Sequence, residues 1–220
     1  MNNDTVAVQL LIDQNQIHMH DCLALRTAVY CNNAPITQMV VEHSDIFAWN
    51  SNAIHLSIEN SSTDIFDILF PYILAKEDTT QNFEFLLQAV AADQFHMVEK
   101  LTPIADVPHQ SVTGLTARLN NNPHPRIIAA LMASMDPSQR ITVAENFALT
   151  GDFQRLKPIV EFLTLSEVQT VYNKICSFSS FDWSLSEKGR ICFDAIDQQR
   201  QKRVLEHTVG NPGSVVKKKL

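Results

Sequence analysis

Cysteine and histidine are the residues of this chain that could supply nucleophilic, acid–base or metal chemistry. The chain has 220 residues, four of them cysteine and eight histidine. A thiolate nucleophile needs a helix N-terminus or a neighbouring positive charge to lower its pKa. Cys31 falls at the end of an expected helix, and Cys176 and Cys192 fall on apolar helical stripes. Without any CxxC pair, we expect four reduced thiols that mostly fill the core.

The histidines that stand out are His55 and the pair His18 and His20. The pair is separated by one residue and could form half of a metal site, but no further ligands follow at zinc-like spacing. We therefore expect His20 and its neighbour Asp21 on a polar loop, and we expect no metal and no cofactor. His55 could act as a general base, but the sequence places no nucleophile beside it.

Composition and motifs exclude several functional classes. A net charge of −7 leaves no basic face for a nucleic-acid partner. No apolar stretch approaches the roughly 20 residues that cross a bilayer, so we expect no stable membrane insertion. The motifs of nucleotide-binding loops, hydrolase elbows and zinc proteases do not occur, which predicts a protein that is not an enzyme. The start of the chain lacks the basic and apolar segments of a signal peptide, so we expect the cytosol.

The elements that must position these residues are helices, because apolar residues recur with the helical period along most of the chain. Five glycines and few alternating Val- or Thr-rich runs argue against an all-β fold. The first expected helix places Val6, Leu10 and Leu11 on one face. The pattern predicts short helices at 5–14, 23–31, 34–45, 53–60, 64–73, 85–94, 95–104, 114–122 and 143–152.

Polar breaks separate the two members of each helix pair, at intervals that repeat. The breaks are rich in Asn, Asp and Gly, which tolerate the left-handed conformation that ends a helix. Equivalent positions in the leading helices follow one another after 29, 32, 29 and 29 residues, a period typical of repeat proteins. The breaks are Asn32–Asn33, Asn60–Ser62, Asp93–Gln94, Asn120–Asn122 and Gly151–Asp152.

The segments resemble degenerate ankyrin repeats, whose leading helix opens with T-P-L-H-x-A. "NAIHLS" at 52–57 stands in that place, "ALRTAV" and "LLQAVA" are weaker copies, and "ALTGDFQRLKPIVEFL" carries the middle of the motif. The resemblance implies an all-α solenoid of helical hairpins over residues 1–164, a half-repeat plus about five repeats. It implies a structural role for His55, whose imidazole would bond backbone in the turn between successive repeats.

The remainder of the chain differs from the array. Residues 165–209 keep helical periodicity without the thirty-residue period and predict a C-terminal cap of two helices, each with a Ser N-cap. Phe178, Phe181 and Trp183 are expected to pack on the last repeat. Residues 210–220 predict a flexible tail ending in the basic run Lys217–Lys219.

In a solenoid, the loop tips and the inner face carry recognition. The most distinctive tip is "SDIFAWNSN" at 44–52, whose two aromatics either anchor a partner or pack under the next repeat. We therefore expect a monomeric, non-catalytic scaffold that binds a partner protein. The divergence of the repeats resembles ankyrin-type effectors of intracellular bacteria or ankyrin proteins of large viruses, so a host protein is one possible partner. The residues expected to bind are Phe47, Trp49, Asn50, His20, Asp21 and Tyr30.

Two other functions stay open. The first is a cysteine-dependent hydrolase or transferase that uses Cys22 or Cys31 with a nearby histidine. The second is a membrane-proximal adaptor that uses the lysine tail on anionic lipid, although each lysine contributes only about 1 kcal/mol.

Overall fold

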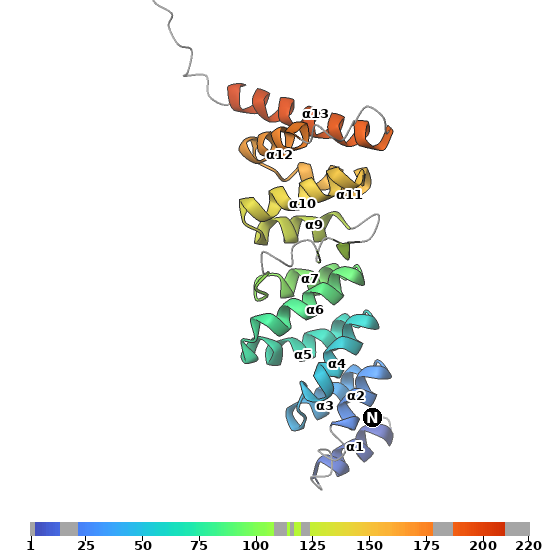
Figure 1. Ribbon diagram of the computed structural model, residues 1–220. Helices are drawn as coiled ribbons and strands as arrows, with labels where there is room; N and C mark the ends of the chain where they lie inside the picture. Colours follow the sequence, from blue (N-terminus) through green and yellow to red (C-terminus); the bar gives the residue numbers. More distant parts are fainter. Residues whose placement is uncertain are drawn as a thin grey trace, which may run out of the picture. The chain divides into compact units, whose positions relative to one another are not determined.

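The protein is helical throughout the part that the structure describes, as the sequence predicts. In the computed structural model, the described residues are 3–13, 22–107, 114, 117–119, 124–177 and 187–209. These ranges contain α-helices and a short 3₁₀ helix but no strand (Figure 1). No helix within them combines the length and the apolar character that crossing a bilayer requires. The all-α class is confirmed.

The chain divides into two compact units, residues 1–107 and 108–220. In unit 1, the leading helices pack on one another in one layer and the second helices in another. The leading helices are α2 (Leu23–Tyr30), α4 (Ala48–Glu59) and α6 (Thr79–Ala91). The second layer contains α1 (Asn3–Asp13), α3 (Ala34–Val40), α5 (Thr63–Lys76) and α7 (Phe95–Leu101), with the 3₁₀ helix Val41–His43 after α3.

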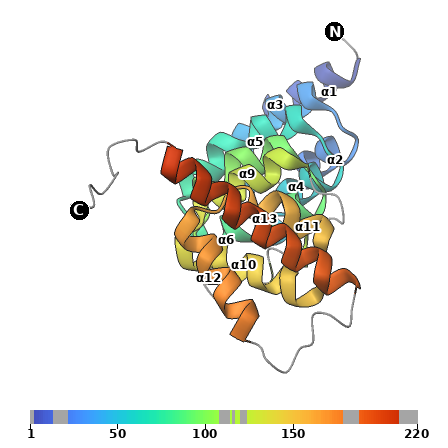
Figure 2. The ribbon, with the colours of Figure 1, turned by 90° about the horizontal axis from the view of Figure 1, so that it is seen from above.

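Unit 2 is built in the same way. Helix α10 (Pro137–Thr150) packs on α12 (Leu165–Ser177), and α11 (Phe153–Val160) packs between α9 (Pro125–Ser134) and α13 (Glu187–Val209). Helix α13 runs across α11 and α12 (Figure 2). The unit boundary at 107 falls within the 1–164 array of the sequence analysis, whose boundaries stay predictions. The tail and the aromatics at 178, 181 and 183 lie outside the described residues.

Four helix pairs are joined by turns of one geometry. The left-handed residue of each turn has a φ of 52°, 56°, 56° and 67° at Asn32, Ser61, Asp93 and Gly151. In all four turns, the residue after the left-handed one donates its N–H to the carbonyl of the residue five positions before itself, at 2.9 Å. This is the hydrogen bond of a Schellman motif. These breaks are confirmed, including the division of residues 50–69 into two helices. The predicted break at 120–122 lies outside the described residues.

The core of each unit lies between its two layers, and it is filled by residues at equivalent distances from these turns. The positions seven residues before and eight residues after each left-handed residue are fully buried. They are Leu25, Ile54, Leu86 and Ala144 before the turns, and Val40, Leu69, Leu101 and Ile159 after them. Because the same positions are buried in each pair, one packing scheme serves the two units.

Helix α1 departs from the usual behaviour of an amphipathic helix. Its apolar residues Val6, Leu10 and Leu11 are exposed, at 51%, 56% and 43% of their surface. The helix packs against α3, and Met39 from α3 lies beside Val6 and Leu10 in a shallow apolar groove. An apolar stripe normally faces the core, but here it faces outward in the part of the chain that the structure describes.

Candidate interaction site

A left-handed turn exposes Trp49 at the start of α4. Trp49, Asn50 and Ser51 have φ values of 55°, 54° and 59°, so the first turn of this helix has the opposite hand. The left-handed conformation costs about 1–2 kcal/mol per residue for residues other than glycine. Three such residues in succession persist only where the surrounding structure holds them. Part of the segment that the sequence predicts as a loop tip is therefore this left-handed turn.

Contacts from α6 and from the start of α2 hold the turn. The buried hydroxyl of Ser51 accepts a hydrogen bond of 2.6 Å from the Gln81 amide of α6. The Ser51 N–H donates to the Phe47 carbonyl at 3.0 Å, and the Phe47 N–H donates to the Asp45 carboxylate at 2.9 Å. The Asp45 N–H donates to Cys22 Sγ at 3.1 Å. Hydrogen bonds from α6 and from the start of α2 therefore hold the backbone of the turn, and Trp49 projects from this ordered backbone.

The Trp49 ring lies against a cation from α2. The Arg26 guanidinium carbon is 4.8 Å from the ring centroid, and Arg26 Nε donates to the Asn52 side chain at 3.1 Å. Trp49 is still 60% exposed, and Tyr30, one turn beyond Arg26 on α2, is 71% exposed. We call Arg26, Tyr30, Phe47, Trp49 and Asn50 the Trp49 surface.

Phe47 differs from Trp49 in its exposure. Its side chain is half-buried, and the Lys76 ammonium lies 3.9 Å from its ring centroid. Lys76 also donates to the Gln81 side chain at 2.8 Å, so Phe47 is linked to the groups that hold the turn. Of the two aromatics, Trp49 presents a free face and Phe47 mainly supports the turn.

His55 lies in the middle of α4 and links it to α6. Its Nδ1 hydrogen bonds to Gln88 Oε1, and its ring meets the edge of Phe85 with centroids 5.2 Å apart. Gln88 Nε2 donates back to the His55 carbonyl at 3.3 Å and to Glu59 at 3.0 Å. The imidazole bonds this side chain of the next leading helix, whereas the ankyrin resemblance implies a bond to turn backbone.

Side-chain bonds of this kind connect consecutive helix pairs along the chain, and they were not predicted from the sequence. Their partners are 26 to 33 residues apart, close to the interval between the turns. Polar residues that recur at this interval are the sequence signal that could have predicted these bonds. The pairs are Arg26–Asn52, Ser51–Gln81, His55–Gln88, Glu59–Gln88, Ser61–Gln94, Asp67–His96, Asp67–Lys100, Arg140–Glu167 and Glu145–Lys174.

The cysteines occupy two kinds of position. Cys22 and Cys192 are buried, whereas Cys31 and Cys176 are exposed. Burial, together with the charge of Asp152, raises the pKa of Cys192 to about 11, so this thiol is protonated at neutral pH. Among the described residues, no hydrogen bond joins a cysteine to a histidine.

Metal ligands do not cluster in the described part of the chain, which contains no group of three or more His, Cys, Asp or Glu able to hold an ion. His20 and Asp21, which the sequence assigns to the binding surface, lie outside that part.

The sequence matches no protein-family model, and neither a curated protein nor a solved structure is significantly similar to it. What can be inferred about function therefore depends on the residues and contacts described above.

Proposed function

We propose that this chain is a non-catalytic scaffold of degenerate ankyrin-like helix pairs that binds a partner protein at the Trp49 surface. The observation that carries the proposal is the exposed tryptophan on a strained turn that neighbouring helices hold rigid. Trp, Tyr and Arg are the residues that most often dominate binding energy at protein interfaces. All three types belong to the Trp49 surface: Arg26 contacts Trp49, and Tyr30 is exposed one turn beyond Arg26 on α2.

The rigidity of the turn supports a binding role in energetic terms. A side chain that is already ordered loses less conformational entropy when a partner covers it. Arg26 restrains the indole from one side, and the Ser51–Gln81 bond restrains the backbone beneath it. Strained backbone of this kind gathers at ligand-binding and switch regions. Two of the three left-handed residues, Trp49 and Asn50, are exposed, so burial in the core does not compensate for their backbone strain.

The recurrence of helix pairs supports the ankyrin-like part of the proposal. The turns at residues 32, 61 and 93 are 29 and 32 residues apart, and the next described turn, at 151, follows after 58 residues, twice 29. Stacked repeats leave their surface free for recognition because their cores are used in packing. We place this scaffold, as a monomer, in the cytosol of its own cell or of a host.

Affinity capture tests the proposal. The wild-type chain and the Trp49→Ala and Tyr30→Ala variants are used as bait in lysate, and affinity is then measured for the main captured protein. We expect Trp49→Ala to weaken binding at least about 30-fold, which corresponds to a loss of about 2 kcal/mol. Circular dichroism should remain unchanged, because the indole is largely exposed.

The matched control is Leu74→Ala. Leu74 is an apolar residue of the same unit, is 50% exposed and lies on α5. It makes none of the contacts that hold the turn, so the Leu74→Ala variant should bind as the wild type does. Equal capture by the Trp49→Ala variant would show that the partner uses another surface.

A further inference from the structure

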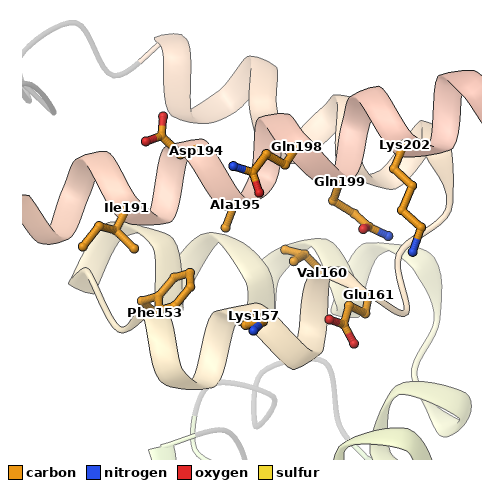
Figure 3. A pocket seen from close by; sticks show the side chains of 10 residues that line it. All are labelled: Phe153, Lys157, Val160, Glu161, Ile191, Asp194, Ala195, Gln198, Gln199 and Lys202. Atoms are coloured by element: carbon orange, nitrogen blue, oxygen red, sulfur yellow. The ribbon is translucent and has the colours of Figure 1, made fainter.

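Two surface features are distinct from the Trp49 surface. The first is a groove of about 460 Å³ between α11 and α13 (Figure 3). Its charged side chains, Lys157, Glu161, Asp194 and Lys202, are exposed, and no contact in the described part of the chain indicates what would fill it. The second feature is the end of unit 1 that α1 and α2 form (Figure 1), where the chain itself shows what covers the equivalent faces.

Helix α1 lacks the cover that the other second helices of unit 1 have. Helices α3, α5 and α7 each pack on the leading helix of their own pair, whereas α1 packs on α3 and has no leading helix of its own within the described residues. Leu11, Val40 and Leu69 follow one another at the 29-residue interval that separates the turns at 32 and 61. Val40 and Leu69 are fully buried, but Leu11 is 43% exposed. Leu11 therefore holds a core position that no leading helix covers.

Three more apolar residues extend this uncovered face along α1. Val6, Ala7 and Leu10 are exposed, and with Leu11 they occupy positions i, i+1, i+4 and i+5, which form one stripe on a helix. The terminal unit of a stack of repeats needs a polar outer face to stay soluble without a partner. Because this outer face is apolar, it is suited to being covered.

The leading helices contact one another through fixed positions, counted back from the left-handed residue of each turn. In α4, Asn52 lies nine residues before that residue and accepts a hydrogen bond of 3.1 Å from Arg26 of α2. In α6, Gln88 lies five residues before it and hydrogen bonds to His55 of α4. The positions nine and five residues before a turn therefore face the preceding leading helix.

In α2, these two positions are Leu23 and Thr27. Leu23 is 49% exposed and Thr27 is also exposed, so no leading helix covers them in the described structure. The position of Leu23 is that of the polar Asn52 in α4, and the change to leucine favours an apolar neighbour. Leu23 and Leu11 thus border one place, beside α2 and on α1, where the preceding member of the row of leading helices would lie.

The surroundings of this place select a helix. It lies on α1 and beside α2 in the same relation in which α2 lies on α3 and beside α4. An extended segment would leave main-chain N–H and C=O groups unpaired against apolar side chains, whereas a helix pairs these groups internally. A second copy of the chain would bring only another α1 and α2, and both of these already pack on other helices of their own unit.

The described pairs also indicate the direction of the helix. The start of a leading helix lies near the end of its second helix, because the Asp45 N–H donates to Cys22 Sγ at 3.1 Å and the Asn82 amide donates to the Ile104 carbonyl at 3.3 Å. A helix bound in this direction would bring its N-terminus toward Asp13, which is exposed at the end of α1. A carboxylate near a helix N-terminus is favourable.

We propose that α1 and α2 bind an amphipathic helix of another protein in the place of a leading helix, with its apolar face on Leu11 and Leu23 and its N-terminus toward Asp13. The bound helix completes the first helix pair of unit 1 and covers its apolar end. This site is separate from the Trp49 surface, and either proposal can fail without the other.

Peptide selection tests the site. A display library of alanine-rich peptides of about four helical turns, with balanced charge and one face randomised, is selected on the full-length chain. We expect enriched peptides to carry large apolar residues at helical spacing. In fluorescence anisotropy they should bind at least about tenfold more weakly to the Leu11→Asp and Leu23→Asp variants. The matched control is Leu74→Asp, because Leu74 is an equally exposed leucine on α5 of the same unit. That variant should bind as the wild type does.

Two further measurements define the bound state. A proline at the centre of an enriched peptide should weaken binding at least about tenfold, because proline breaks a helix. Hydrogen exchange of the α1 amides should slow when the peptide binds. Circular dichroism of the Leu11→Asp and Leu23→Asp variants should match that of the wild type, since both leucines are about half exposed.

Several results would overturn the proposal. They are the enrichment of no peptide, normal binding by both aspartate variants, and equal binding of proline-substituted peptides. Sedimentation that shows a dimer of the chain, abolished by Leu11→Asp, also overturns it, because a second copy would then cover this end. Trp49→Ala should leave peptide affinity unchanged, and a loss of binding there would mean that the peptide occupies the Trp49 surface instead.

Discussion

The ion pair between Arg140 and Glu167 gives the sharpest test of how the helix pairs are joined. Arg140 of α10 donates to Glu167 Oε1 through Nε at 2.9 Å and Nη2 at 2.6 Å. Glu167 Oε2 accepts from the N–H and the hydroxyl of Thr164 at 2.7 and 2.8 Å, which caps α12. Arg140 Nη1 also donates to the carbonyls of Met132 and Met135 near the end of α9. One residue pair thus connects three helices.

Replacing Glu167 with alanine should be costly. The carboxylate side chain is only 4% exposed and the arginine side chain 20%. Removing one partner of a buried ion pair costs about 3–5 kcal/mol, because the remaining charge is left uncompensated. In the variant, Arg140 would keep its carbonyl partners and some contact with solvent, so the cost should lie at the lower end of this range. We expect Glu167→Ala to lower the free energy of unfolding by about 3 kcal/mol.

The matched control is Glu145→Ala. Glu145 pairs with Lys174 at 2.8 Å and also joins α10 to α12, but the lysine side chain is 49% exposed. An exposed pair contributes at most about 1 kcal/mol, so the Glu145→Ala variant should lose less than that.

The assay combines urea unfolding with hydrogen exchange of the α12 amides, since stacked helices can open in part before the whole chain unfolds. We expect faster exchange in α12 for Glu167→Ala than for Glu145→Ala. A loss below about 1 kcal/mol for Glu167→Ala, or equal losses for both variants, would refute the assignment of a buried, coupled pair.

Two further predictions concern pH and backbone conformation. Burial alone would raise the pKa of Glu167, but hydrogen bonds from Thr164 and Arg140 outweigh it and lower the pKa below its ordinary 4.5. The ionised carboxylate therefore stabilises the fold fully above about pH 4.5, and this stabilisation is lost as the pH falls through the lowered pKa of Glu167. In urea unfolding, the difference in free energy of unfolding between the wild type and Glu167→Ala should therefore shrink in acid. Gly151→Ala should cost about 1 kcal/mol in thermal unfolding because an alanine is strained in the left-handed region. Gly114→Ala, where an added Cβ meets no atom within 4 Å, should not destabilise the chain.

The helix pairs could be predicted from the sequence because their determinants are local. Apolar residues with the helical period set the buried faces, and Asn32, Asp93 and Gly151 mark positions that tolerate the left-handed conformation. Ser61 takes the same conformation without being a typical left-handed residue, because its place between two strong helices requires it. The prediction that Ser166 caps α12 was wrong. The helix begins at Leu165, and Thr164 rather than Ser166 forms the capping bonds.

The site details could not be predicted, because they depend on neighbours distant in sequence. A tryptophan is among the last residues expected in a left-handed turn, and only the contacts of Gln81 and Arg26 make that conformation tenable.

The left-handed turn at Trp49, Asn50 and Ser51 departs from stable local geometry at the place where we propose binding. A glycine at position 50 would relieve part of the left-handed strain. This change would stabilise the isolated chain, because Asn50 is exposed and contributes no packing to the core. Departures from local consistency are expected at functional sites, where stability is given up for a surface that a partner completes.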